Sequence, residues 1–330
     1  MTTLVTGATG FVGSAVARAL AARGHALRLL ARPTSNRRNL AGLDAEVVTG
    51  DLTDPESLQR AASGCRFVVH VAADYRIWVP DRAAMLRANV SGAVSMMQAA
   101  MTAGAERIVH CSSVAALGLR EDSSPATEDT PVARETIVGT YKQSKYDAEH
   151  AVLDLVRRQG LPAVIVNPAA PVGPRDIKPT PTGRMIRDAA NGRVPAYIDT
   201  GLNVVHVDDV GEGHVLALER GRIGERYILG GENLLLRELL AMVAAELGRP
   251  PPRIALPIGP LFPVAAVMEG VARLTGIEPL VTRDHLRMAR KRMFFSSAKA
   301  MKELGYKPRP ARQAVADAVT WFQANGMVRR

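Results

Sequence analysis

Short apolar runs alternate with helical patterns along the first half of the chain. Mainly apolar runs of strand length occur at residues 3–6, 27–31, 46–49, 66–71, 107–111 and 163–167. The run 66–71 in particular is what we expect of a parallel strand that is covered on both faces. The stretches between them carry apolar residues at helical spacing. This alternation predicts an α/β fold, a Rossmann-type doubly wound parallel sheet.

The pattern changes after the last of these runs. Residues 203–231 contain one more helix pattern and one more strand, and we expect both to return to the sheet. The segments 169–202 and 232–330 are mainly helical, with breaks rich in proline. They predict a smaller, mostly helical C-terminal lobe that binds substrate, next to a main domain formed by residues 1–168.

Three features of the second half are open to more than one interpretation. Asp208 and Asp209 are open to interpretation as paired catalytic carboxylates, but Asp209 with Glu212 three residues later favours a helix capping box. Residues 254–274 form an apolar pattern with little charge. A helix buried in the lobe is the first interpretation, and peripheral contact with a membrane is the alternative. The basic run 283–292 is either a solvated face or a surface for an anionic substrate or lipid.

A glycine-rich turn joins the first strand to the first helix. Gly7 permits the tight turn, Gly10 lets a pyrophosphate approach the backbone, and Gly13 lets helix and strand pack closely. The anion would sit on unpaired amides at the positive end of the helix dipole. We therefore expect a nucleotide cofactor to contact the residues of this turn, Gly7, Thr9, Gly10, Phe11, Val12 and Gly13.

The end of the second strand indicates which cofactor is preferred. Arg32 stands where NAD-binding domains of this kind have a carboxylate for the ribose hydroxyls. An arginine there suits the additional phosphate of NADP. Arg37 and Arg38 follow in the same loop. They either add to the binding of this phosphate or simply belong to a solvated basic loop. NADP(H) is therefore the preferred cofactor, and NAD(H) remains open.

A catalytic constellation follows the fifth strand. Tyr141 and Lys145 stand four apart on one helical face, and Ser113 ends the preceding strand. A free tyrosine has a pKa near 10, too high for a general base at neutral pH. We expect the Lys145 ammonium, together with an oxidised nicotinamide, to lower this pKa. Ser113 can hydrogen-bond the oxygen that is reduced or oxidised. Small residues after the fourth strand, Ala72 and Ala73, leave room for a ligand.

Composition narrows the class of protein. The 330 residues are 47% hydrophobic, and two cysteines fit a reducing cytoplasm. The net charge of +10 needs no nucleic acid, because no reading helix, zinc-ligand spacing or aromatic-basic motif is found. A phosphorylated ligand or an anionic membrane surface explains the charge equally well.

No histidine stands in metal-ligand spacing, so no metal is expected. No signal peptide is expected, since a core strand starts at once, and no apolar run could span a bilayer. We expect a cytoplasmic protein, and leave membrane contact and a homodimer open.

The motifs together resemble the extended short-chain dehydrogenase/reductases, the NAD-dependent epimerase/dehydratase family. The resemblance rests on residues 6–13, 50–52, 70–73, 89–92, 112–113, 141–145, 205–209 and 297–305. Within the family, the chain is similar to dihydroflavonol 4-reductase-like proteins. Segments 167–176, 178–183 and 195–201 bring it closest to the bacterial hopanoid-associated sugar epimerases.

The resemblance implies further roles along the chain. Asp51 and Leu52 would flank the adenine, Ala72 and Ala73 the ribose and phosphate path. Lys145 would hold the nicotinamide ribose, and the backbone after Pro168 would meet the carboxamide. The chain departs from many sugar-modifying relatives, which have an arginine and a tyrosine near the position of Asn167. This departure weakens any transfer of nucleotide-sugar contacts.

Three functions follow from these features. The first is an NADP-dependent oxidoreductase that acts on a carbonyl or secondary alcohol, with a role in hopanoid lipid formation implied by the resemblance alone. The second is an epimerase acting on a sugar or nucleotide sugar, and the third is a non-catalytic NADP sensor. In each case the partner is a small molecule, and we expect the substrate to contact Tyr75, Val114 and Arg184.

Overall fold

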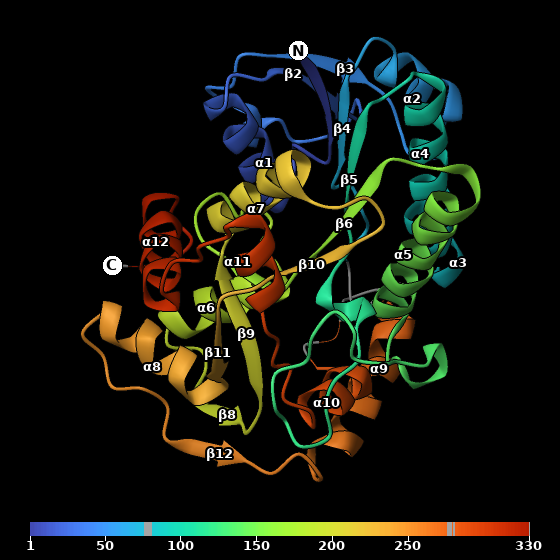
Figure 1. Ribbon diagram of the computed structural model, residues 1–330. Helices are drawn as coiled ribbons and strands as arrows, with labels where there is room; N and C mark the ends of the chain where they lie inside the picture. The colour runs from blue at the N-terminus through green and yellow to red at the C-terminus, as the bar shows by residue number, and fades with distance from the viewer. Residues whose placement is uncertain (76–80, 276–278, 280, 330) are drawn as a thin grey trace.

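The computed structural model describes residues 1–75, 81–275, 279 and 281–329 (Figure 1). Within them, seven strands form one parallel sheet in the order β10-β6-β5-β4-β1-β2-β3. They are β1 (Thr2–Thr6), β2 (Ala26–Ala31), β3 (Ala45–Thr49), β4 (Phe67–His70), β5 (Arg107–Cys111), β6 (Ala163–Pro168) and β10 (Arg226–Leu229). The sheet confirms the predicted Rossmann-type fold.

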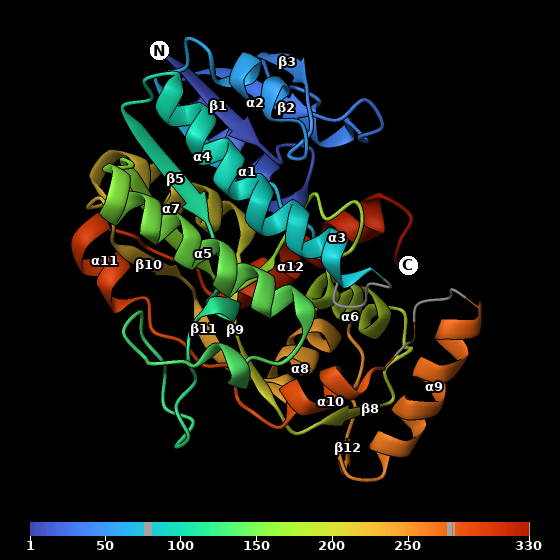
Figure 2. The same cartoon turned by 90° about the vertical axis from the view of Figure 1, so that its right-hand side faces the viewer.

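Helices cover both faces of this sheet, as Figures 1 and 2 show. Side chains alternate across each strand, so Leu4 and Ile108 join one core and Val5 and Val109 the other. The first core is closed by α2 (Pro55–Ala62), α4 (Gly92–Thr102) and α5 (Thr140–Gln159). The second is closed by α1 (Phe11–Ala22), α7 (Val207–Arg220) and α11 (Ala298–Leu304).

The strand order places a crevice at one edge of the sheet. From β1 the order runs through β2 to β3 on one side and through β4, β5 and β6 on the other. The carboxyl ends of β1 and β4 therefore flank the point where the order reverses. Ligands bind at such a point in open α/β sheets.

The smaller lobe is built from short strands and helices. One three-stranded sheet contains β7 (Ala170–Val172), β9 (Gly201–His206) and β11 (Glu232–Leu235), and β8 (Ala196–Ile198) pairs with β12 (Ile254–Leu256). Three helices pack into one core, namely α6 (Pro181–Ala190), α8 (Leu236–Glu246) and α12 (Ala311–Ala324). Two more helices lie together beside them, α9 (Leu261–Thr275) and α10 (Arg283–Ala289).

Two sequence-based interpretations of this half are wrong. The helix α7 begins at Val207 and is capped by His206, whose Nδ1 accepts from the Asp208 amide at 3.0 Å. Asp209 lies inside the helix, and its carboxylate accepts from the backbone and side chain of Arg309, both at 2.7 Å. A partner 100 residues away has therefore replaced the predicted capping box of Asp209 and Glu212.

The second wrong interpretation concerns the apolar segment 254–274. It forms β12 and α9, but α9 is not a buried lobe helix, because it packs mainly on α10. Ala265 and Ala272 are buried, whereas Val267 and Leu274 are 68% and 90% exposed. No helix in the described ranges is both long and apolar enough to cross a membrane.

Candidate active site

Glycine is required at two points of the turn between β1 and α1. Gly7 has a φ of +76°, and a Cβ atom on it would lie 2.7 Å from the backbone nitrogen of Ala72. A Cβ atom on Gly13 would lie 2.1 Å from the Gly7 carbonyl oxygen. No side chain is compatible with contacts this short. The Gly10 amide closes the turn by donating to the Gly7 carbonyl at 2.9 Å.

The amino-terminal turn of α1 is open toward a ligand. Gly10 precedes the helix, no side chain caps the first amides, and the first turn contains no acidic residue. Gly10 is exposed, Phe11 is buried and Val12 is partly buried, and both of these side chains pack near Val207. Free amides at the positive end of a helix dipole fit the pyrophosphate of a dinucleotide.

Asn39 holds this turn from a neighbouring loop. Its Nδ2 donates to the carbonyl oxygens of Thr9 and Gly10, both at 3.3 Å, and to that of Arg175 at 3.1 Å. The side chain is buried. Sequence reasoning missed Asn39, because its acceptors come from segments 29 to 136 residues away and leave no local signal.

Arg32 lies exposed directly after β2. Burial acts to raise the pKa of Asp51, but hydrogen bonds from Thr53 and the Arg32 guanidinium lower it overall. Asp51 therefore stays ionised next to a basic loop, in which Arg37 is also exposed. The loop has the charge that a ribose phosphate would need.

Small residues line the crevice at the ends of β3 and β4. Ala72 and Ala73 are partly exposed, and the Ala72 amide donates to Thr6 Oγ1 at 3.1 Å. Leu52 follows β3 and lies so close to Gly92 that a Cβ atom there would be 2.8 Å from the Leu52 Cβ. A ligand is expected above these strand ends because the strand order reverses there.

Ser113, Tyr141 and Lys145 come together after β5 and at the start of α5. The hydroxyls of Tyr141 and Ser113 are hydrogen-bonded. Ser113 Oγ also accepts from the Ala115 amide at 3.1 Å, which orients it. Lys145 is 5% exposed, and its Nζ donates to the Cys111 carbonyl at 2.8 Å.

The pKa of the tyrosine in the free protein is set mainly by burial. Burial raises the pKa of Tyr141 to about 12, although the hydrogen bond with Ser113 acts to lower it. Lys145 does not depress this pKa in the free chain, because its ammonium points at the Cys111 carbonyl. Burial also lowers the pKa of Lys145. Tyr141 therefore holds its proton in the free protein. The lowering of its pKa by Lys145 together with an oxidised nicotinamide concerns the cofactor complex and stays a prediction.

Asn89 fixes the catalytic helix to the end of β4. A π-helical turn, Arg87–Ser91, lies between α3 (Arg82–Leu86) and α4. Such turns are frequent at functional sites. Asn89 Oδ1 accepts from the Asp74 amide at 2.7 Å, and its Nδ2 donates to Ser144 Oγ at 2.9 Å. Ser144 lies between the two catalytic positions of α5.

Two of the residues expected to contact substrate share one neighbour. Tyr75 is 39% exposed, and its hydroxyl donates to the Lys178 carbonyl at 3.5 Å. Burial and then Asp176 raise the pKa of Tyr75, while Arg184 lowers it, so both charged groups lie near the phenol. Burial raises the pKa of Asp176 itself to about 6. Sequence reasoning missed Asp176.

The third expected substrate residue stands apart from this pair. Val114 begins the short helical turn that Ser113 caps, and it is partly exposed. Its position thus follows that of the catalytic serine. Among the side chains described, no group of three or more His, Cys, Asp and Glu residues could hold a metal ion.

Comparison with known proteins agrees with this geometry. Residues 3–230 match the model of the NAD dependent epimerase/dehydratase family. The chain belongs to this family of extended short-chain dehydrogenase/reductases. It is therefore an NAD(P)-dependent enzyme of the oxidoreductase and epimerase type, as the motifs indicated.

Similar proteins span nearly the whole chain. A Synechocystis protein named "Putative dihydroflavonol 4-reductase" is 43% identical over 98% of this chain and 95% of its own length. "Sterol demethylase protein B" from Methylococcus capsulatus is 37% identical over 99% of this chain and all of its own. The crystal structure of gox2253 is 61% identical and superposes with a TM-score of 0.90, covering 99% of both chains.

The departure from the sugar-modifying members of the family has a structural counterpart. Asn167, next to Pro168 at the end of β6, is fully buried. Its Nδ2 donates to the Ser113 carbonyl at 3.1 Å and to Glu149 Oε2 at 2.6 Å. Glu149 also pairs with Arg226 at 3.4 Å. Asn167 thus holds the backbone of the catalytic Ser113 in place through its hydrogen bond to the Ser113 carbonyl.

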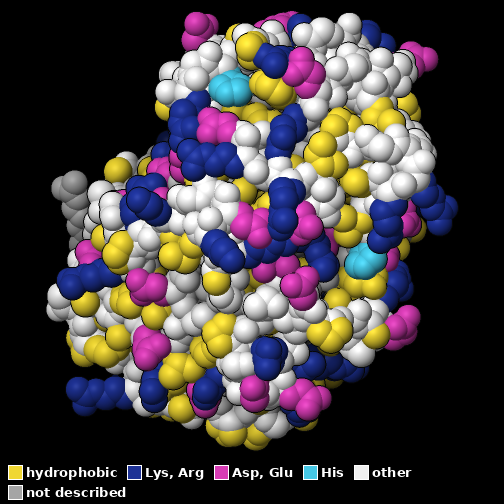
Figure 3. Space-filling view, in the orientation of Figure 1, with side chains coloured by type: hydrophobic (Ala, Val, Ile, Leu, Met, Phe, Trp, Pro, Cys, Tyr) yellow, Lys and Arg dark blue, Asp and Glu magenta, His cyan; other side chains and the backbone are white. Residues whose placement is uncertain are grey.

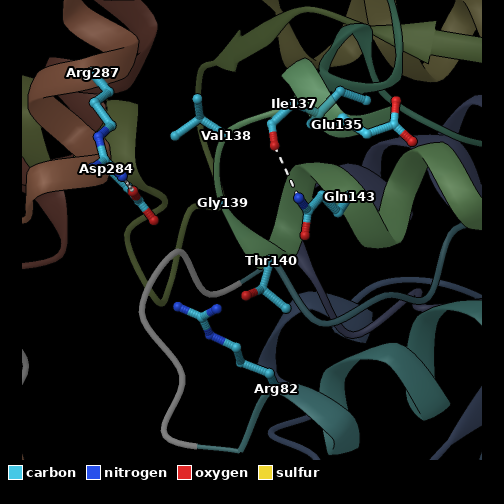
Figure 4. Close-up of a pocket in the computed structure, with 9 residues that line it drawn as sticks. All are labelled: Arg82, Glu135, Ile137, Val138, Gly139, Thr140, Gln143, Asp284 and Arg287. Atoms are coloured by element: carbon cyan, nitrogen blue, oxygen red, sulfur yellow. Dashed lines mark hydrogen bonds and ion pairs between the residues drawn. The ribbon is translucent and has the colours of Figure 1, made fainter. Parts of the chain in front are cut away.

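A cavity of about 280 Å³ lies beside the catalytic helix of this family member. Figure 4 shows Thr140 and Gln143 from the start of α5 on one side and α10 on the other. Arg82 closes it from α3, and Gln143 Nε2 donates to the Ile137 carbonyl at 3.0 Å. The lining residues are Arg82, Glu135, Ile137, Val138, Gly139, Thr140, Gln143, Asp284 and Arg287. Tyr141 and Ser113 do not line this cavity, so it adjoins the catalytic pair without containing it.

Proposed function

We propose that the chain is an NADP(H)-preferring reductase that interconverts a carbonyl and a secondary alcohol. The observation that carries this proposal is the placement of Tyr141 beside Ser113 and the buried Lys145, at the carboxyl end of β5 in a dinucleotide-binding sheet. A phenol that keeps its proton at neutral pH can act as the general acid for a carbonyl.

Each catalytic residue has one task in this proposal. The nicotinamide, when bound, supplies the hydride. Tyr141 Oη donates its proton to the carbonyl oxygen, and Ser113 Oγ donates a hydrogen bond to the same oxygen. Lys145 would hold the nicotinamide ribose. Asn89 and Asn167 position α5 and Ser113 through the contacts described above.

The preference for NADP(H) rests on the loop after β2. Arg32 is exposed there. The carboxylate of the neighbouring Asp51 accepts a hydrogen bond from the Thr53 amide at 2.9 Å. The guanidinium is thus available for charge-assisted bonds to a ribose phosphate. Hydrogen bonds to charged groups contribute about 1.5–3 kcal/mol, or about one to two decades of affinity.

Titration of nicotinamide fluorescence with NADPH and NADH tests the preference. We expect wild type to bind NADPH more tightly, and Arg32→Ala to lose about one to two decades of NADPH affinity while NADH binding is unchanged. The control is Arg60→Ala, which removes the same charge from the exposed side of α2. Equal affinities of wild type for both cofactors would refute the preference. The preference should also weaken as salt is raised, because an exposed phosphate contact is screened.

A polycyclic lipid is the substrate class that we propose. Two observations support it: the buried Asn167 replaces the arginine of many sugar-modifying members, and one relative is named "Sterol demethylase protein B". The sequence resemblance to hopanoid-associated proteins points the same way. A role in hopanoid lipid formation is the most specific form of this proposal.

A substrate panel separates this function from sugar epimerisation. NADPH oxidation is measured with a 3-keto steroid, a long-chain 2-alkanone and UDP-glucose. We expect turnover with the steroid and net oxidation of NADPH. Epimerisation of UDP-glucose with no net change in cofactor would instead establish the sugar epimerase, the alternative that the family description favours.

A further inference from the structure

The helix α9 has an apolar face that no element of the described structure covers. Val264, Val267, Val271 and Leu274 follow one another at intervals of three, four and three residues, which places them on one side of a helix. They are 53%, 68%, 53% and 90% exposed. Figure 2 shows α9 at the edge of the molecule, apart from the other helices except α10. We call these four residues the α9 face.

Exposed apolar side chains gather in this region of the molecule. Eleven large hydrophobic residues are exposed in the described part of the chain, and six of them fall within residues 254–274. The two others of the six, Ile254 and Leu256, lie in β12, which leads directly into α9. Single exposed apolar residues need no explanation, but a contiguous group indicates an interaction surface.

The segment around the α9 face is strongly basic. Residues 251–292 contain seven Lys or Arg and only three Asp or Glu. The Arg290 guanidinium lies 4.8 Å from the centre of the Phe262 ring, at the first turn of α9. Arg253, immediately before β12, is exposed. An apolar helix face with a cationic border is complementary to an anionic bilayer surface.

The charge elsewhere on the molecule is arranged differently. In Figure 3, basic side chains across the middle of the molecule are interleaved with acidic ones. The contacts there include Arg222 with Glu303 at 3.0 Å and Lys299 with Glu225 at 2.6 Å. Ion pairs also occur within 251–292, between Arg283 and Glu269 at 2.9 Å and between Arg287 and Asp284 at 3.2 Å. This segment of 42 residues nevertheless holds four of the ten surplus positive charges of the chain, next to the exposed apolar residues.

We propose that the α9 face docks on an anionic lipid surface. The helix has 15 residues, about 22 Å at 1.5 Å per residue, and would lie in the interface plane because a span needs about 20 apolar residues. A second copy of the chain is less favourable on the α9 face, because dimerisation there would place the basic residues of two copies, each of net charge +10, next to each other. Because α10 packs on α9 and also lines the cavity beside α5, docking would bring that cavity close to the bilayer.

Co-sedimentation of the full chain with lipid vesicles tests this proposal. Vesicles of phosphatidylcholine alone are compared with vesicles containing one part in three phosphatidylglycerol. We expect binding to the anionic vesicles at low salt, and about tenfold weaker partitioning at 0.5 M NaCl or onto the neutral vesicles. Equal partitioning onto both vesicle types, or none onto the anionic ones, would overturn the proposal.

Two matched variants locate the surface. Val267→Asp with Leu274→Asp should lower partitioning at least about tenfold, because it places carboxylates on the α9 face. Ile223→Asp with Met301→Asp is the control, since both residues are 52% exposed and lie outside the α9 region. Circular dichroism and thermal unfolding establish that both variants fold.

Sedimentation velocity distinguishes the competing occupant. If wild type is a dimer that only the α9 variant dissociates, and anionic vesicles do not bind it, the α9 face is an interface between copies and the proposal is wrong. If both double variants partition like wild type, the docking surface lies elsewhere and the proposal also fails. None of these readouts depends on the reaction that the enzyme catalyses.

Discussion

At the scale of single residues, the hydroxyl of Tyr141 is the group on which the proposed reaction depends. Tyr141→Phe removes that hydroxyl alone, so folding and cofactor binding should survive. General acid–base groups contribute about 10²–10⁴-fold, and we expect kcat to fall within this range. The measurement is NADPH oxidation under saturating cofactor, with thermal unfolding recorded in parallel. Tyr146→Phe, five residues further along α5, is the matched control.

Two companion variants separate positioning from proton transfer. Ser113→Ala should lower kcat with little effect on cofactor affinity, because it loses one hydrogen bond to the reacting oxygen. Lys145→Met should lower both kcat and cofactor affinity, because we propose that the ammonium binds the nicotinamide ribose and also acts on the Tyr141 phenol. A Tyr141→Phe enzyme that turns over its true substrate at the wild-type rate would show that another group holds the proton.

Single residues also mark the limit of inference from sequence. Gly7 and Tyr141 stand out because a turn or a helix repeat sets their spacing locally. Asn39 and Asp176 carry no such signal, because their neighbours come from distant segments. The hydrogen-bond partner of the Lys145 ammonium could not be predicted for the same reason. Spacing places Lys145 on the right face of α5, but the carbonyl it bonds belongs to β5.

At the scale of elements, the strand–turn–helix unit of β1 and α1 provides a sharp prediction. A methyl group on Gly13 would overlap the Gly7 backbone at 2.1 Å. Gly13→Ala should therefore separate helix from strand and destabilise the protein by about 3 kcal/mol. Gly10→Ala meets only one atom, at 3.2 Å, and its φ of −87° suits alanine. We expect it to fold normally and bind NADPH at least about tenfold more weakly, because its methyl group occupies the pyrophosphate path.

Urea unfolding and fluorescence titration together test this pair of variants. The two variants should differ in what they lose: Gly13→Ala should lower the free energy of unfolding, and Gly10→Ala should lower the affinity for NADPH. If Gly10→Ala binds NADPH like wild type, the pyrophosphate does not approach the backbone at that position. If Gly13→Ala is as stable as wild type, the close contact between α1 and β1 is not needed for folding.

Elements differ in how far their sequence predicts them. The strands of the main sheet were predictable because each is a short, mainly apolar run flanked by turns, largely buried except in the edge strand β3, and their order confirms the fold. The π-helical turn at Arg87–Ser91 was not, since one inserted residue barely changes a helical pattern. The cap of α7 was misassigned because Arg309, far along the chain, takes the Asp209 carboxylate. Local pattern thus predicts an element's type better than its ends.

At the scale of the whole molecule, the main sheet and the lobe differ in how well their packing could be foreseen. A parallel sheet has two faces that must both be covered, so the pattern of α5 implies what it packs on. The sequence of α9 is more apolar than that of α5, but it does not show whether protein, lipid or water contacts its apolar face. The exposure of Leu274 is therefore a property of tertiary arrangement, and only the structure shows it.

The buried histidines behind the active site make the whole molecule sensitive to acid. Burial lowers the pKa of His70 to about 3 and of His214 to about 4, and holds that of His110 well below its usual value. These groups are neutral in the folded state and take up protons near pH 6.5 when unfolded. The unfolded state therefore binds more protons below pH 6.5, and stability falls as pH drops toward 4, by about 1.4 kcal/mol per pH unit for each histidine.

His110→Phe is the variant that isolates this effect. The His110 ring stacks on His70 with 5.5 Å between centroids, and neither of its nitrogens has a hydrogen-bond partner within the described structure. Phenylalanine keeps the ring and removes one titrating group. We expect the free energy of unfolding, measured by urea denaturation between pH 6 and pH 4.5, to depend on pH less steeply than in wild type, by about 1.4 kcal/mol per unit. At pH 8 both states of the histidine are neutral, so any difference there reports packing alone. Parallel curves for the two proteins would mean that His110 takes up a proton in the folded state and that burial does not keep it neutral.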